Sequence, residues 1–263
     1  WDNSEIEYLL IGDSFTHGAC VNRPNDIPSV LRALSNKKVL NLGLRGNGPL
    51  REYATLKEYL PNNTKKIIWM YFETNDLEGL HQEKKDNFLM NYLKDKDFKQ
   101  NLISRQSEID EKLKKILKKR VSKKSKFFSF VKLYQLRSYI YKFLYLEDRN
   151  KFSNLERNKI LSDFELIINS AKDFAKKNES ELYFVYLPGY ERYSNPTYDE
   201  KNYYEIKKII SSLNIEFIDI HEEVFAKEKN PLENFPFQLF GHYNVTGYNK
   251  VSKAIYRLSS SYK

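Results

Sequence analysis

Residues 9–20 read LLIGDSFTHGAC, so that three apolar residues run directly into Gly-Asp-Ser. A short apolar run that ends at a glycine is typical of a buried strand. A serine at the exit of such a strand is exposed, fixed in place and close to a helix start. Either a nucleophile or a helix cap would occupy that position, so the rest of the chain must decide the role of Ser14.

Five short runs rich in β-forming residues alternate with amphipathic helical patterns along the chain. The β-rich runs, each followed by a turn-forming or polar residue, are Tyr8–Ile11, Lys38–Leu42, Lys66–Phe72, Leu182–Leu187 and Ile215–Ile220. Apolar residues recur at helical spacing in Asp26–Leu34, Leu50–Leu60, Leu161–Lys177, Tyr203–Leu213 and Val245–Leu258. Near-continuous apolar strands that alternate with such helices predict an α/β fold, a three-layer α/β/α sandwich around a parallel sheet.

The third β-rich run is followed by a long lysine-rich segment, residues 81–158, in which Leu, Ile, Phe and Tyr recur at three- and four-residue steps. No Gly/Pro/Ser linker marks a second domain. We therefore expect one domain over residues 1–263, with a helical insertion over residues 81–158. Residues 111–126 of this insertion hold nine Lys or Arg and one Glu, which is +8 of the net charge of +9.

Three interpretations of this basic insertion stay open. It is a solvated helical face, the usual role of a charge run, or it contacts an anionic membrane surface, or it binds an acidic glycan. Nucleic acid ranks last as a partner, because little basic charge lies elsewhere and the chain has no recognised binding motif.

The composition excludes several kinds of site. The single cysteine, Cys20, excludes an intrachain disulfide and a CxxC metal cluster. The four histidines lack the close spacing of a zinc site, and we expect no metal and no cofactor. The longest apolar runs are far shorter than the ~20 residues that span a bilayer. No signal segment opens the chain, which begins almost at once with strand-like sequence and leaves open both a trimmed upstream segment and the compartment.

Chemically useful side chains follow the predicted strands, at the edge where parallel sheets bind ligands. Ser14 follows the first strand, the glycine-rich turn 41–50 the second and Asn75 the third, while His242 precedes the last helix. Acyl transfer through serine needs a base within hydrogen-bond reach and donors aimed at the developing oxyanion. We therefore assign Ser14 as the candidate nucleophile and His242 as its base. The backbone N–H groups of Ser14 and Gly46, with the Asn75 amide, form the candidate oxyanion hole.

Four blocks in this order resemble the SGNH (GDSL-type) hydrolase superfamily. The blocks are Gly12-Asp13-Ser14, Asn41-x-Gly43-x-x-Gly46, Asn75-Asp76, and His242 followed by Asn244 and Gly247. The resemblance implies a flavodoxin-like sheet of strand order 2-1-3-4-5 and the catalytic set Ser14, Gly46, Asn75 and His242. It covers both ends of the chain and the strand framework, but not the insertion.

Two residues depart from the superfamily's pattern. Glu73 stands where the third block usually has glycine. Leu239 stands three residues before His242, where the superfamily usually has the aspartate that orients the imidazole. Either a backbone carbonyl holds His242, or another acid substitutes, or activity is weak or lost; the candidate acids are Asp219, Glu222 and Glu233.

Substrate contacts are expected beside the nucleophile and after the fourth strand. Asp13 is assigned to the substrate-binding edge, with bonding of neighbouring backbone N–H groups as its structural alternative. The loop LPGYERYSNPTY (187–198) carries Tyr190 and Tyr193, whose rings stack on sugar faces and whose hydroxyls bond sugar hydroxyls. The alternative, that this loop merely covers the sheet, carries equal weight.

Together these residues predict a serine-dependent esterase or O-acyltransferase. Its expected substrate is a small-molecule or glycan ester, with an acylated carbohydrate or polysaccharide favoured. The alternative is an SGNH-fold carbohydrate-binding or scaffold domain that is catalytically impaired because it lacks the usual aspartate. In that alternative Ser14 is a helix cap and His242 a surface histidine.

Overall fold

The computed structural model describes residues 5–123 and 153–260. The chain divides into two compact units, one formed by residues 1–98 and 158–263 and the other by residues 99–157. The first unit holds the sheet and every candidate site residue named above. Residues 124–126 of the basic run, and the whole aromatic stretch after it, lie outside the described residues, so the proposed roles of the insertion remain predictions.

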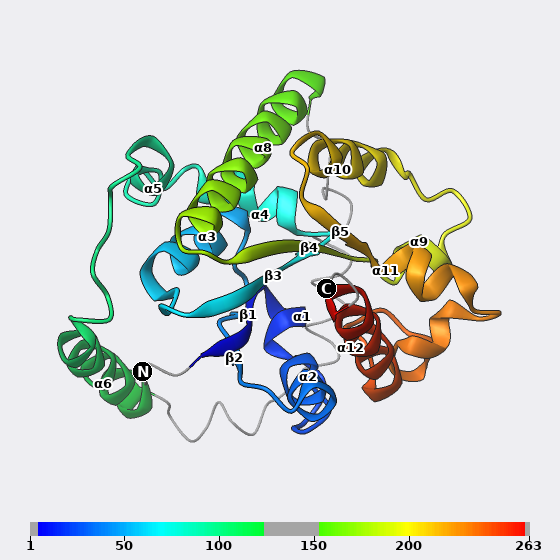
Figure 1. Cartoon of the computed structure of the whole chain (residues 1–263), viewed down its shortest axis with the longest axis horizontal. Helices are drawn as coiled ribbons and strands as arrows, with labels where there is room; N and C mark the ends of the chain where they lie inside the picture. Colours follow the sequence, from blue (N-terminus) through cyan, green and yellow to red (C-terminus); the bar gives the residue numbers. More distant parts are fainter. Residues whose placement is uncertain (1–4, 124–152, 261–263) are drawn as a thin grey trace. The chain divides into compact units, whose positions relative to one another are not determined.

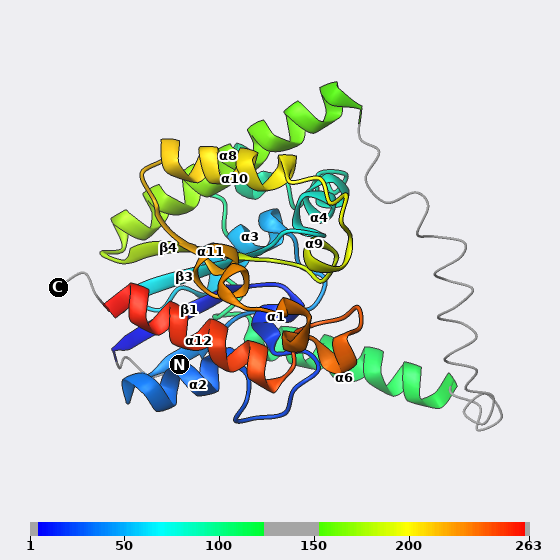
Figure 2. The same ribbon diagram turned by 90° about the vertical axis from the view of Figure 1, so that its right-hand side faces the viewer.

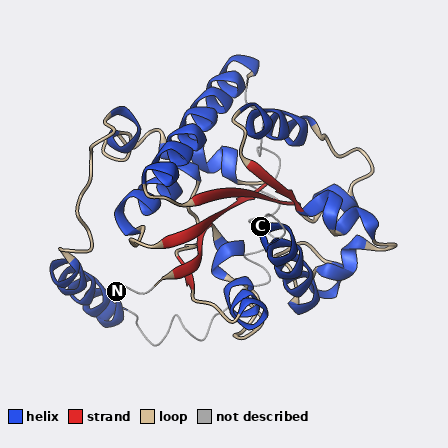
Figure 3. Ribbon diagram, viewed as in Figure 1, coloured by secondary structure: helices blue, strands red, loops and turns tan. Residues whose placement is uncertain are grey.

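Five parallel strands form one sheet in the order β2-β1-β3-β4-β5. Figure 3 draws this sheet in red among the helices. The strands are β1 (Ile6–Gly12), β2 (Val39–Asn41), β3 (Thr64–Phe72), β4 (Glu181–Leu187) and β5 (Glu216–Asp219). In the central pairing, Leu9 of β1 lies opposite Ile67 of β3. The expected parallel sheet and its strand order are confirmed.

Helices cover both faces of this sheet, which makes the three layers (Figures 1 and 2). One face carries α2 (Ile27–Ser35) and α12 (Val245–Ser260), which pack against each other. The other face carries α3 (Pro49–Tyr59), α8 (Asn154–Lys177) and α10 (Lys201–Ser212). Right-handed crossover connections place helices on both faces of this sheet. The chain moves in one direction across the sheet from β1 to β2 and in the opposite direction from β2 onward, so the connecting helices change face.

The strands are almost continuously apolar because both of their faces are buried. Tyr8 and Leu10 of β1 lie in a core cluster with Ile27 of α2 and Val251 of α12. Leu9, which alternation places on the opposite face, is also fully buried. Burial of one such leucine side chain contributes about 1.5–3 kcal/mol to the stability of the sandwich.

Shorter elements complete the described chain. They are α1 (Ser14–His17), α4 (Asp76–Glu83), α5 (Asn91–Lys94), α6 (Gln106–Lys123), α9 (Glu191–Ser194), α11 (Ile220–Glu223) and the 3-10 turns η2 (Phe225–Lys227), η3 (Pro231–Asn234) and η4 (Pro236–Gln238). Among the helices described, none has the length and apolar character needed to cross a membrane. Helix α1 directly follows β1, and α4 begins just after β3, so both open at the carboxyl edge of the sheet.

Candidate active site

Ser14 and His242 meet at this edge from opposite ends of the chain. Ser14 is the first residue of α1, and His242 lies in the loop that precedes α12. His242 Nε2 is 2.8 Å from Ser14 Oγ, although the two residues are 228 positions apart. A serine hydroxyl within hydrogen-bond reach of an imidazole is the arrangement that activates a serine nucleophile.

Asp13 is buried and ties the start of α1 to the loop after β3. Its Oδ1 accepts the backbone N–H of Phe15 at 2.8 Å, which caps α1. Its Oδ2 lies 3.3 Å from Ser14 Oγ and accepts the Asn75 side-chain amide at 3.2 Å. A hydroxyl has one proton to donate, and the shorter contact directs that of Ser14 to His242. Asp13 thus makes the backbone contact that the sequence offered as its structural alternative.

Asn75 and Gly46 are the remaining residues that the sequence predicts as oxyanion-hole donors. Asn75 immediately precedes α4, and its amide group carries two protons, of which one bonds Asp13. Gly46 has a φ of +80°, and apart from the glycine and its two chain neighbours no heavy atom lies within 4 Å of the place where a Cβ would stand. Glycine suits this backbone, because L-residues rarely adopt it, and the space above the turn is open to a ligand.

The far nitrogen of the His242 ring contacts a residue that the sequence left unassigned. His242 Nδ1 lies 3.6 Å from Cys20 Sγ, and the Phe15 ring packs against the imidazole with centroids 4.6 Å apart. Leu239 is exposed and supplies no acid. In the sequence, Cys20 stands out only because it ends the stretch 9–20 that contains Gly-Asp-Ser. No spacing rule predicts that it contacts His242.

The three candidate acids make their hydrogen bonds elsewhere. Asp219 accepts the Tyr203 hydroxyl at 2.6 Å and caps α11. The Glu222 carboxylate also contacts the Tyr203 hydroxyl. The Glu233 carboxylate accepts a hydrogen bond from the side-chain amide of the asparagine three residues before it. Within residues 5–123 and 153–260, no carboxylate hydrogen-bonds His242 Nδ1, so the position of the usual aspartate has no acidic substitute there.

The surroundings of His242 favour its neutral form. Burial is the largest influence and lowers the pKa of the imidazole below its usual value; the Asp13 carboxylate opposes this, and the positive charge of Arg45 adds to it. A neutral imidazole can accept a proton at Nε2. The ring is therefore in the state that a general base requires at neutral pH.

The tyrosine-bearing loop after β4 is fastened to the loop that carries Asn75. Arg192 bonds Glu73 through Nε and Nη2, the latter at 2.7 Å, and both side chains are buried. Glu73 also accepts the Tyr186 hydroxyl and the backbone N–H of Gly189. The glutamate at the superfamily's glycine position therefore binds the two loops together.

Tyr190 and Tyr193 take different positions in this loop. Tyr190 packs edge-on against Phe235 and Phe240, on the segment that leads to His242. Tyr193 stacks on a core phenylalanine, and its hydroxyl bonds His221 Nδ1 at 2.9 Å. Tyr193 thus supports the loop as well as facing the cavity described next.

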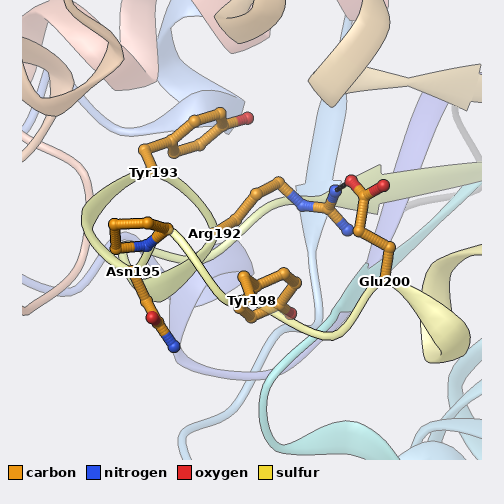
Figure 4. A pocket seen from close by; sticks show the side chains of 6 residues that line it. Arg192, Tyr193, Asn195, Tyr198 and Glu200 are labelled. Carbon is orange, nitrogen blue, oxygen red and sulfur yellow. Dashed lines mark hydrogen bonds and ion pairs between the residues drawn. The ribbon is translucent and has the colours of Figure 1, made fainter.

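An open cavity of about 380 Å³ lies in the bend of the same loop (Figure 4). Its lining residues are Arg192, Tyr193, Asn195, Pro196, Tyr198 and Glu200. Figure 4 shows the Arg192 guanidinium directed to Glu200, an ion pair of 2.5 Å. Because Arg192 bonds carboxylates on both sides, the cavity presents tyrosine rings, the Asn195 amide and the Arg192–Glu200 ion pair rather than a free positive charge. In the part of the chain that the structure describes, no cluster of three or more His, Cys, Asp or Glu could hold a metal ion.

Comparison with known proteins identifies the fold. No family's sequence pattern matches the chain, and no curated protein matches it. Among solved structures, it is similar to a putative lipolytic protein of the G-D-S-L family from Desulfitobacterium hafniense, with a TM-score of 0.52 and 16% identity over 97% of this chain and 99% of that one. A lipase/acylhydrolase from Enterococcus faecalis gives 0.51 and 13% over 96% and 94%, and an acetyl xylan esterase gives 0.50 and 12% over 96% and 98%. The fold expected from the four sequence blocks is confirmed.

Proposed function

We propose that this chain, which has the fold of the SGNH hydrolase superfamily, is a serine-dependent ester hydrolase. The observation that carries the proposal is the 2.8 Å contact between Ser14 Oγ and His242 Nε2 at the carboxyl edge of the sheet. A helix cap needs no imidazole beside it, so this contact favours the enzyme over the scaffold alternative. The lipolytic and esterase neighbours in the same fold support the reaction class.

In the first step Ser14 Oγ attacks the ester carbonyl carbon. The Oγ–C bond forms while the hydroxyl proton moves to His242 Nε2. The carbonyl oxygen becomes an oxyanion, which the backbone N–H groups of Ser14 and Gly46 and the second amide proton of Asn75 stabilise. The intermediate then expels the alcohol, which takes the proton from His242, and the acyl group stays on Ser14.

Deacylation repeats these steps with a new nucleophile. A water molecule gives its proton to His242 Nε2 and attacks the acyl carbon, and the carboxylic acid leaves as Ser14 regains its proton. An acceptor hydroxyl in place of water would make the protein an O-acyltransferase. The same residues serve both outcomes, and the choice depends on which nucleophile the acyl-enzyme admits.

We further propose that the alcohol part of the ester is a carbohydrate. The loop after β4, which leaves the carboxyl edge of the sheet, holds a cavity lined by Tyr193, Tyr198 and Asn195, which combine ring faces for stacking with groups that bond hydroxyls. Arg192 has its donors engaged by Glu73 and Glu200, so a neutral sugar suits this cavity better than an anionic one. One structural neighbour is named as an acetyl xylan esterase, which is in keeping with this class.

Turnover of two acetyl esters tests the proposal. The wild type should hydrolyse 4-nitrophenyl acetate and release acetate from acetylated xylo-oligosaccharides, and Ser14→Ala should lower kcat by at least about 10³-fold. Ser211→Ala, on an exposed helical surface, is the matched control and should keep wild-type rates. A wild-type protein that turns over neither ester, or a Ser14→Ala variant as active as the wild type, would contradict the esterase proposal. The scaffold domain would then be the remaining alternative.

A further inference from the structure

The geometry points to Cys20 as the positioning residue for His242, in the role that an aspartate usually has in a serine triad. The inference rests on the proposed function, because it concerns the base of that reaction. Its direct support is the 3.6 Å contact between Cys20 Sγ and His242 Nδ1. That nitrogen is the one turned away from Ser14, since Nε2 is the atom 2.8 Å from Ser14 Oγ.

The loop that carries Cys20 is held against the segment that carries His242. The Tyr248 hydroxyl, from the first turns of α12, donates to the backbone carbonyl of Ala19 at 3.0 Å. Cys20 itself has a φ of +72°, a conformation that few residues other than glycine adopt. The tie through Tyr248 therefore fixes a strained backbone that places Sγ beside the imidazole.

Ser14 and Cys20 contact the two nitrogens of the imidazole, and together they bear on which nitrogen carries the proton. Because the Ser14 hydroxyl directs its proton to Nε2, the ring proton stands on Nδ1, from which it can be donated to Cys20 Sγ, a weak acceptor. The other neutral form would place a proton on Nε2, where it would block proton transfer from Ser14. With its sulfur accepting from Nδ1–H, Cys20 completes the productive arrangement and limits rotation of the ring.

During acylation the Cys20 sulfur makes no covalent bond and changes no oxidation state. The Ser14 proton moves to Nε2 as the Oγ–C bond forms, and the Nδ1 proton stays between the ring and Sγ. A neutral sulfur stabilises the resulting imidazolium less than a carboxylate would, because it is a weak acceptor and carries no negative charge to attract the cation. The chain thus has a Ser-His pair with a weaker orienting group than the usual triad.

Three substitutions at this position test the inference. Cys20→Ala removes the acceptor and should lower kcat about five-fold at unchanged KM, the effect of one neutral hydrogen bond. Cys20→Ser keeps an acceptor and should recover most of that loss. Cys20→Asp should raise kcat about ten-fold and shift the acid limb of the kcat/KM profile to higher pH, because a carboxylate stabilises the imidazolium. Aspartate is among the residues that tolerate a positive φ, so it fits the loop.

Nitrogen-15 NMR of histidine-labelled protein gives a readout independent of ester turnover. The His242 signals, assigned by their loss in His242→Gln, should report the Nδ1–H tautomer in the wild type and a higher pKa in Cys20→Asp. Asn22→Ala, an exposed change in the same loop, is the control and should alter neither the tautomer nor kcat.

The two proposals fail in different ways. If the wild type hydrolyses esters but Cys20→Ala matches Asn22→Ala in kcat, pH profile and tautomer, Cys20 has no positioning role and the inference is overturned. If the His242 tautomer and pKa respond to Cys20 as expected but no ester is turned over, the proposed function fails while the contact stands.

Discussion

The buried ion pair between Glu73 and Arg192 should be among the most sensitive points of the structure. The Arg192 side chain is 3% exposed and that of Glu73 is fully buried. Arg192→Met leaves the Glu73 carboxylate without its cationic partner, although neutral donors that include the Tyr186 hydroxyl and the Gly189 N–H remain. Removal of one partner of a buried ion pair typically costs about 3–5 kcal/mol, because the other charge stays desolvated. We expect a loss of that size in the free energy of unfolding.

Urea unfolding followed by the fluorescence of buried Trp69 measures this loss. Glu73→Gln combined with Arg192→Met leaves no orphan charge, so the double variant should be more stable than the sum of the two single losses. Arg257→Met breaks an exposed pair with Glu223 and is the matched control, with an expected loss of at most about 1 kcal/mol. An Arg192→Met variant as stable as the Arg257→Met control would refute the reasoning, as would strict additivity in the double variant.

Three further predictions concern pH and packing. The pKa of His242 is lowered by burial and by Arg45, so kcat/KM should fall to half at a pH below the ordinary histidine value, and Arg45→Gln should move that midpoint upward in a pH–rate profile. Burial and neighbouring carboxylates raise the pKa of Glu52, so its contribution to stability is present at low pH and is lost as the pH rises through the native pKa. Glu52→Gln should remove that loss, seen as a smaller difference in urea stability between about pH 5 and about pH 8. A Cβ at Gly43 would lie 2.6 Å from carbons of Thr16, so Gly43→Ala should lower stability by about 1–3 kcal/mol in thermal unfolding.

The sheet was predictable because its strands carry a strong local signal. A parallel strand covered on both faces must be apolar at nearly every position, and β3 and β4 show this in their sequences. The ends of the strands were less predictable. The strand β2 covers Val39–Asn41, two residues fewer than the expected Lys38–Leu42. Strand ends depend on where pairing stops, which no local pattern records.

The approach of Ser14 to His242 was predictable from topology. Both residues were expected at the same edge of a parallel sheet, and the motif order supplied the pairing. The contact of Cys20 with the imidazole was not, because it depends on the conformation of a loop and on a partner more than two hundred residues away. Glu73 stood out as a departure from the superfamily's pattern, but its partner Arg192 is 119 residues away and no periodicity connects them.

Covalent labelling of Ser14 is the most direct test of the account. A serine-directed aryl phosphonate should add one phosphonyl group to the intact wild-type protein, and peptide mass spectrometry should place it on Ser14. The rate of labelling should fall steeply in His242→Ala, because the hydroxyl is then without a base, and Ser14→Ala should take up no label. An unlabelled wild type, or a label on another residue at the same rate in all three proteins, would contradict the claim that Ser14 is an activated nucleophile.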